Sequence, residues 1–323
     1  MIKLSIVSAL YNSEKYIAKC LDSILNQDIP QTDYEIILVN DGSPDKSCEI
    51  AESYAQKHKN IRVITQKNQG PGVARNTGMK EAQGKYLTII DPDDYLQENI
   101  YKNLLQRMET DDLDMLRFGF TMVDEEYNIL PMPKGAKNTA DYSEEVVDGK
   151  VFLSKKLGYA CFVWANIYKT SLINENKVYF QPGFYIDDTE WLPRVLMCAK
   201  RVSSVKIPAY FYLQRRGSLM NTTAASVGKK LEGCFTAIEL MSEESKNQPD
   251  KNVKKWYRGL NSVIVIGVLS IISSIEKEKK EFYLKRLLNY KLFPLSYYNH
   301  SNHLRIKIAI ANISLKLYFK IFS

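Results

Sequence analysis

Short apolar runs alternate with helical patterns along the first third of the chain. Four apolar runs predict β-strands, at 4–8, 35–39, 61–65 and 86–90. Between these runs, apolar residues recur at helical spacing near 13–27, 45–58 and 72–83. Strands that alternate with helices of this length indicate βαβ units. We therefore expect an α/β fold with a mostly parallel sheet flanked by helices.

The second half of the chain changes character. One more strand is predicted at 114–120, and the chain is helical beyond about residue 220. The uncharged stretch 259–275 contains Asn261, Gly267 and four serines, so we expect a buried or amphipathic helix there, not a transmembrane span. Residues 251–323 hold 14 of the 44 lysines and arginines but only 3 of the 37 acidic residues, which indicates a contact of this tail with an anionic surface.

The composition is that of a folded protein, with 45% hydrophobic and 25% charged residues. The five cysteines lie far apart and there are only three histidines, so a zinc site or a disulfide framework is disfavoured. The apolar run after Met1 is too short for the core of a signal peptide. These features predict a cytoplasmic protein.

Three carboxylates, Asp91, Asp93 and Asp94, directly follow the apolar run at 86–90. Uncompensated charges at the end of a buried strand would repel each other, and a divalent cation such as Mg²⁺ or Mn²⁺ would relieve this repulsion. If the chain continues extended, Asp91 and Asp93 lie on the same side. The alternative is an acidic turn that begins the next helix.

Polar residues also follow the other predicted strands, and ligands of parallel sheets bind at that edge. Tyr11 and Asn12 come after the first strand, and 40–43 reads Asn-Asp-Gly-Ser after the second. The segment 70–78 reads Gly-Pro-Gly-Val-Ala-Arg-Asn-Thr-Gly, whose glycines allow a ligand to approach and whose arginine can bind phosphate. A second acidic pair stands at 187–188.

This ordered set resembles the inverting glycosyltransferases of family 2, which have the GT-A fold and build bacterial surface polysaccharides. The resemblance covers about residues 1–218 and rests on the motifs at 8–12, 39–43, 70–78, 91–94 and 187–188. It implies a nucleotide-sugar-binding half at 1–110 and an acceptor-side half at 111–218. Residues 219–323 would then form a basic, helical C-terminal extension.

The resemblance also implies roles for single residues. Tyr11 and Asp41 would hold the nucleobase and Asp91 the ribose. Asp93 would hold the metal that bridges the diphosphate, and Asp188 would be the catalytic base, with a helix N-cap as its alternative role. The full donor-binding set would be Ala9, Tyr11, Asn12, Asp41, Gly70, Arg75, Asp91 and Asp93. Asp94, Asp187, Trp164, Arg215 and Ser218 also match family elements near the acceptor and the diphosphate.

The implied activity is transfer of a hexosyl or N-acetylhexosaminyl group, from a UDP-sugar by family expectation, to a hydroxyl of a glycan or lipid-linked acceptor. Two alternatives stay open: a degenerate relative that binds a glycan or partner without catalysis, and a sugar nucleotidyltransferase. The second would be expected to carry a glycine-rich loop after the first strand, where this chain has Ala-Leu-Tyr-Asn at 9–12. A dinucleotide-binding dehydrogenase is disfavoured because G-x-G-x-x-G is missing there.

The last 20 residues hold four of the 14 basic residues of the tail and no acidic residue. A helical wheel of 304–323 gathers Arg305, Asn312, Lys316 and Lys320 on one side, next to a broad apolar arc of Ile306, Ile310, Ile313, Leu317 and Ile321. Lys307 falls inside this arc, which counts against a deep position in a membrane unless its amino group reaches the headgroups. We therefore expect the tail to dock on the anionic inner face of the cell membrane. The alternative is a helix packed on the rest of the chain or on a second subunit of a homodimer. No nucleic-acid-binding motif is present.

Overall fold

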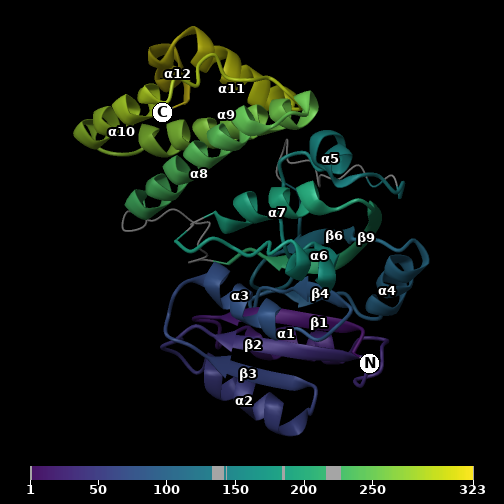
Figure 1. Cartoon of the computed structure of the whole chain (residues 1–323). Coiled ribbons are helices and arrows are strands. Elements are labelled where there is room, and N and C mark those ends of the chain that lie inside the picture. The colour runs from purple at the N-terminus through teal and green to yellow at the C-terminus, as the bar shows by residue number, and fades with distance from the viewer. Residues whose placement is uncertain (1, 133–141, 143, 184–185, 216–226, 323) are drawn as a thin grey trace.

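Strands β1 to β4 form the parallel half of a mixed sheet (Figure 1). The computed structural model describes residues 2–132, 142, 144–183, 186–215 and 227–322. Neighbouring strands in the order β3-β2-β1-β4 pair in parallel. The elements of this half are β1 Leu4–Leu10, α1 Ile17–Leu25, β2 Tyr34–Asn40, α2 Ser47–Lys57, β3 Ile61–Thr65, α3 Pro71–Glu81 and β4 Tyr86–Ile89. The four strands and three helices predicted for the first third are confirmed.

Side chains of β1 alternate between two apolar cores on opposite faces of the sheet. Ile6 belongs to the core that contains the buried side chains of α1, and Val7 to the core that contains Ala74 and Met79 of α3. Gly78 of α3 lies so close to the sheet that an added Cβ would come within 2.4 Å of the Val7 side chain. This close packing fixes α3, and Arg75 on it, above the edge of the sheet.

Beyond β4 the sheet becomes mixed, because β8 lies antiparallel between β4 and β6. Strand β9 then pairs in parallel with β6 and antiparallel with the short β5. The strand predicted at 114–120 is confirmed as part of β6. The elements of this half are β5 Tyr95–Leu96, α4 Tyr101–Thr110, β6 Met115–Val123, β7 Ile129–Leu130, α5 Gly149–Val151, the π-helical turn η1 Phe152–Lys156, β8 Asn166–Lys169, α6 Thr170–Glu175, α7 Asp187–Cys198 and β9 Val202–Leu213. The expected fold class is confirmed.

The described C-terminal residues form helices that stack beyond α7 (Figure 1). They are α8 Val227–Asn247, α9 Lys251–Ser273, α10 Lys277–Asn289, α11 Asn302–Ile313 and α12 Leu315–Phe322. Among the described residues, α9 alone is long and apolar enough to span a membrane, and 67% of its apolar window is buried. The buried indole of Trp256 donates to the Gly158 carbonyl oxygen at 2.6 Å, which ties α9 to the end of η1. Helix α9 is therefore the buried helix expected at 259–275.

The expectation of one continuous helix at 304–323 is wrong. The helix is interrupted at Ser314, whose extended backbone (φ −162°, ψ 120°) separates α11 from α12. Asn312, expected on the polar face, instead binds both the backbone N–H and the carbonyl oxygen of Leu295. Ile308 and Tyr318 are buried, so one side of this helix pair packs on the protein.

Candidate active site

The predicted acidic cluster forms a tight turn directly after β4. The N–H of Asp94 donates to the Asp91 carbonyl oxygen at 3.1 Å. The expectation that Asp91 and Asp93 extend together from the strand is therefore wrong, because the chain turns between them. The next element is β5, so the alternative of a helix that begins at this turn is wrong as well.

Tyr210 of β9 anchors this turn. Its hydroxyl donates to the Asp94 carboxylate at 2.7 Å and accepts the Asp91 N–H at 3.1 Å. The N–H of Leu213 donates to the other oxygen of Asp94 at 2.8 Å. Asp94 is 2% exposed, and burial together with Asp93 and Asp91 raises its pKa well above the usual value. Asp94 thus ties the turn to β9.

Arg75 of α3 joins the turn to the second acidic pair. Its guanidinium contacts the carboxylates of Asp91 at 2.8 Å, Asp187 at 2.9 Å and Asp188 at 3.3 Å. The side chain is only 8% exposed. Burial opposes the charge, but the three carboxylates outweigh this effect and raise the pKa of Arg75 well above its usual value. The structure thus brings together residues up to 113 positions apart in the chain.

Asp187 and Asp188 begin α7, whose N-cap is Ile186. The alternative in which Asp188 is itself the N-cap is therefore wrong, although a negative charge in the first turn still suits the helix dipole. One oxygen of Asp188 contacts Arg75 and the other accepts the Val163 N–H at 3.4 Å. Burial raises the pKa of Asp188 well above its usual value; Arg75 opposes this, whereas Asp187 and Asp91 add to it.

Residues at the ends of β1 and β2 lie side by side, since Leu10 pairs with Asn40. Ala9, near the end of β1, is half-buried, and Tyr11, just beyond β1, is 48% exposed. Asn12 has a left-handed backbone (φ 56°), and its N–H donates to the Ser43 hydroxyl at 2.8 Å. An exposed tyrosine ring therefore stands at the carboxyl edge of the parallel strands, as expected.

Asp41 is buried and organises the 66–70 loop. Its carboxylate accepts the side-chain amide of Gln66 at 2.8 Å and the backbone N–H groups of Gln69 and Gly70 at 2.9 and 2.8 Å. Gly70 has φ 91°, a conformation that side chains disfavour. These bonds give Asp41 a structural role in addition to any contact with a ligand.

Two further predicted residues lie around the turn. The Nε of Arg215 contacts the Asp93 carboxylate at 2.6 Å. Trp164 is buried and stacks on the rings of Tyr210 at 4.4 Å and Phe162 at 4.7 Å. Trp164 therefore supports the tyrosine that anchors the turn. Ser218 lies outside the described residues.

Comparisons with known proteins identify the family. Residues 5–163 match the description Glycosyl transferase family 2. Glycosyltransferase GlyG of Streptococcus pneumoniae is 31% identical over 228 residues, which cover 68% of this chain and 73% of GlyG. The chain belongs to glycosyltransferase family 2. The uncharacterized glycosyltransferase EpsJ of Bacillus subtilis is 33% identical over 216 residues, 67% of this chain, and the match spans only 62% of EpsJ.

The fold of this family 2 chain is also that of a solved structure. The crystal structure of S. aureus TarS 1–349 in complex with UDP-GlcNAc matches with a TM-score of 0.74 at 22% identity. The match covers 99% of this chain and 90% of the TarS chain, and so includes the C-terminal helices. The expected GT-A fold is confirmed.

The turn suits a divalent cation that takes most of its ligands from a substrate. Within the described parts of the chain, no group of three or more His, Cys, Asp or Glu side chains is placed to hold a metal ion. Burial and the neighbouring Asp91 raise the pKa of Asp93 despite Arg215, so negative charge at Asp93 is incompletely compensated. Mg²⁺ commonly binds one or two carboxylates together with substrate phosphates. Asp93 and a diphosphate would form such a donor set.

Several residues that build this family 2 site carried no signal in the sequence. Tyr210 lies within an ordinary strand pattern, and the contact of Val163 with Asp188 uses a backbone N–H. Arg75 was expected to bind phosphate, but in the structure it is paired with carboxylates. Only the crowding of carboxylates at 91–94 indicated that a positive charge would be needed near them.

Proposed function

We propose that this protein transfers a sugar from a nucleoside-diphosphate sugar to a hydroxyl of a glycan or lipid-linked acceptor during synthesis of bacterial surface polysaccharide. The observation that carries the proposal is the contact of Arg75 with both Asp91 and Asp188. It joins the acidic turn at the end of β4 to the acidic start of α7. The relatives GlyG and EpsJ, both described as glycosyltransferases, support this activity over a nucleotidyltransferase.

The proposed donor is a UDP-sugar that carries a hexose or an N-acetylhexosamine. TarS, which shares the fold, was crystallised with UDP-GlcNAc, and this supports the choice. We assign the uracil to the edge formed by Ala9, Tyr11 and Asn12, above the loop that Asp41 and Gly70 shape. Tyr11 offers an exposed ring face for stacking. Asp91 is assigned to the ribose, since its carboxylate is 27% exposed beside the turn.

Asp93 would hold a Mn²⁺ or Mg²⁺ ion on the diphosphate, and Arg215 stands beside it as a second positive charge. The bound cation supplies Lewis-acid stabilisation of the leaving diphosphate. Asp94 and Tyr210 keep the turn in place. Arg75 holds Asp91 and Asp187 so that the donor side and the start of α7 keep a fixed separation.

Asp188 is the proposed base. It removes the proton of the acceptor hydroxyl as the hydroxyl oxygen bonds to the anomeric carbon and the bond from that carbon to the diphosphate oxygen breaks. The bond electrons leave with the diphosphate, and a single displacement of this kind inverts the anomeric centre. The raised pKa of Asp188 makes the carboxylate a better proton acceptor than an exposed aspartate.

The test replaces Asp188 with Asn, which keeps the shape but not the proton acceptor. UDP release from a UDP-sugar with Mn²⁺, and water as the acceptor, should fall on the order of 10²–10⁴-fold. UDP-sugar binding, measured as a thermal shift, should persist. Asp187→Asn is the matched comparison. If Asp188→Asn retains turnover and Asp187→Asn loses it, the base is misassigned; if the wild-type protein binds UDP-sugars but never releases UDP, the degenerate non-catalytic alternative holds.

We further propose that residues 1–218 form the catalytic domain and that the 219–323 extension docks it on the anionic inner face of the membrane. In the tail, Ile306 is 57% and Ile313 78% exposed, with Leu317 and Ile321 exposed beside them. The side chains of Arg305, Lys316 and Lys320 are exposed on the same two helices. Apolar side chains flanked by cations suit an anionic lipid surface.

Deleting the tail would uncover the core around Ile308 and Tyr318, so point substitutions make the sharper test. Ile313→Asp combined with Leu317→Asp should reduce co-sedimentation with phosphatidylglycerol vesicles. Ile129→Asp is the control, because Ile129 is 74% exposed on β7, which pairs with β6 in the sheet. Equal sedimentation of all three proteins, or none by the wild type, would leave a second subunit as the partner of these residues, and a dimer would then be sought by sedimentation velocity.

A further inference from the structure

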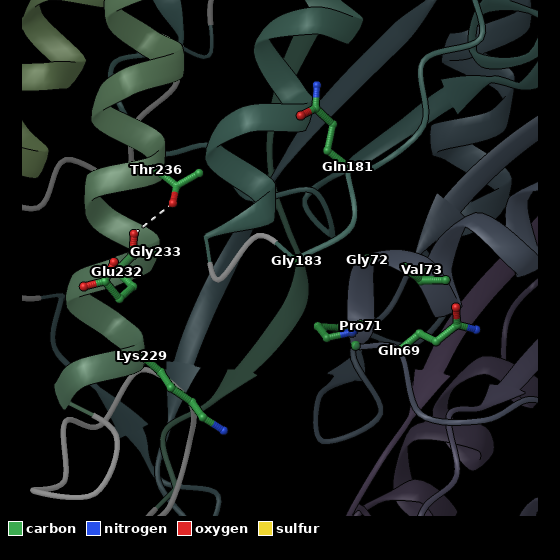
Figure 2. Close-up of a pocket in the computed structure, with 11 residues that line it drawn as sticks. Gln69, Pro71, Gly72, Val73, Gln181, Gly183, Lys229, Glu232, Gly233 and Thr236 are labelled. Atoms are coloured by element: carbon green, nitrogen blue, oxygen red, sulfur yellow. Dashed lines mark hydrogen bonds between the residues drawn. The ribbon is translucent and has the colours of Figure 1, made fainter.

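A pocket of about 460 Å³ opens between the start of α3 and the first turns of α8 (Figure 2). Residues 69–73 line one side, and Lys229, Glu232 and Thr236 of α8 line the other. Gln181 and Gly183, from the segment that precedes α7, lie between the two sides (Figure 2). The pocket is thus lined both by residues of the proposed catalytic domain, 1–218, and by residues of the C-terminal helices.

Gly72 lines this pocket and lies next to Asp187 of the acidic pair at 187–188. A Cβ added at Gly72 would lie 3.1 Å from the Asp187 carboxylate and 3.1 Å from the Cβ of Phe180. A side chain at Gly72 would therefore crowd Asp187 and Phe180. Gly72, which lines the pocket, thus lies directly against the first turn of α7.

The loop at residues 69–70 separates the pocket from the edge assigned to the nucleotide. The backbone N–H groups of Gln69 and Gly70 donate to Asp41, while the same two residues line the pocket. A ligand in the pocket would thus lie on the α7 side of this loop. The proposed base, Asp188, is in α7, so this is the side on which an acceptor hydroxyl is needed.

The pocket lining favours a hydroxyl-rich ligand that carries negative charge. None of the described lining residues is aromatic, and Gln69, Gln181 and Thr236 offer amide and hydroxyl groups. Both oxygens of Glu232 lie 2.7 Å from Nη1 of Arg286, so its charge is compensated. Lys229 makes no ion pair with any described residue, and its amino group points away from Glu232 (Figure 2). One uncompensated cation therefore remains in the lining.

We propose that this pocket is the acceptor site and that Lys229 of α8 selects an acceptor with a phosphodiester close to the hydroxyl that receives the sugar. This inference rests on the proposed function, since it assigns the second substrate of that reaction. It makes the C-terminal helices part of the substrate site and gives α8 control over acceptor choice.

The charge test uses a glycerol-phosphate trimer as the probe and uncharged triglycerol as its neutral counterpart. Binding is measured by calorimetry on the full chain saturated with UDP and Mn²⁺. Lys229→Glu turns an attraction into a repulsion and should weaken binding of the trimer by about tenfold. Lys246→Glu is the matched control on α8, because its position is about 25 Å further along the helix.

The volume test is Thr236→Trp, which fills the pocket from α8 and should abolish binding of the trimer. Glu243→Trp, on the exposed face of the same helix, is its control and should bind as the wild type does. The inference is overturned if wild-type protein that binds UDP-sugar does not bind the trimer, if triglycerol binds equally well, or if Lys229→Glu has no effect. A wild-type protein that fails to bind any UDP-sugar would instead refute the proposed function.

Discussion

Replacing Arg75 with methionine tests the arrangement at the centre of the site. The substitution leaves the carboxylates of Asp91, Asp187 and Asp188 close together without the guanidinium that now contacts all three. Removing one partner of a buried ion pair destabilises a protein by about 3–5 kcal/mol. Because the Asp91 and Asp188 side chains are about a quarter exposed, water will screen part of this effect, and we expect about 3 kcal/mol at pH 7.

The pH dependence of the stability tests whether repulsion between the carboxylates causes the loss. Without Arg75, burial and the repulsion from Asp187 and Asp91 raise the pKa of Asp188 in the folded state even further above its unfolded value. The folded variant then binds more protons than the unfolded chain, so its stability rises as the pH falls. We expect the deficit of Arg75→Met relative to the wild type to shrink between about pH 7 and pH 5. Adding Asp187→Asn should also recover part of the loss.

Urea unfolding followed by tryptophan fluorescence measures both effects. Arg75→Lys keeps the charge but cannot span the two short contacts, so it should lose about 2 kcal/mol. Lys3→Met is the control, since Lys3 is 51% exposed in its pair with Asp33, and its effect on the free energy of unfolding should be much smaller than that of Arg75→Met. A stability of Arg75→Met equal to the wild type at pH 7, or a deficit that is the same at pH 5, would refute the reasoning.

Two further predictions concern the anchor of the turn and the C-terminal helices. Tyr210→Phe removes the hydroxyl that binds Asp94 and the Asp91 N–H, so unfolding free energy should fall by about 2–3 kcal/mol and calorimetry should show weaker UDP-sugar binding; unchanged binding would contradict the anchoring role. Burial lowers the pKa of His300 from 6.5 to about 4, so the wild type should lose stability as pH falls through this window, and His300→Phe should lose less in urea unfolding. Parallel pH profiles for these two proteins would count against this reasoning.

The parallel half of the sheet was predictable because its strands are buried on both faces. β1, β2 and β4 are therefore nearly continuous apolar runs, which stand out from the helical spacing between them. The place of the site followed from the same pattern, because ligand-binding residues of parallel sheets follow the strands. In this way Tyr11, Asp41 and Asp91 were predicted to lie at that edge, directly after β1, β2 and β4.

The tail could not be predicted, because a helical wheel assumes an unbroken helix. No proline or glycine marks the break at Ser314. The interruption of the helix lies next to a tertiary contact, in which the side-chain amide of Asn312 hydrogen-bonds to the backbone of Leu295, 17 residues earlier. The exposed apolar positions nevertheless stay exposed, because α11 and α12 each keep one side away from the protein.

Arg117 shows most clearly why the buried hydrogen bonds that support the site could not be predicted from the sequence. An arginine in a strand is expected at the surface, yet Arg117 of β6 is 1% exposed, and burial lowers its pKa. It pairs with no carboxylate among the described residues and instead donates to the Ala160 carbonyl oxygen at 2.9 Å and to Asn166 at 3.3 Å. Asn166 in turn donates to the carbonyl oxygens of Phe162 and Val163, and the Val163 N–H reaches Asp188. A buried cation thus fixes the backbone that contacts the proposed base, and neither hydropathy nor motif spacing records such a chain of contacts.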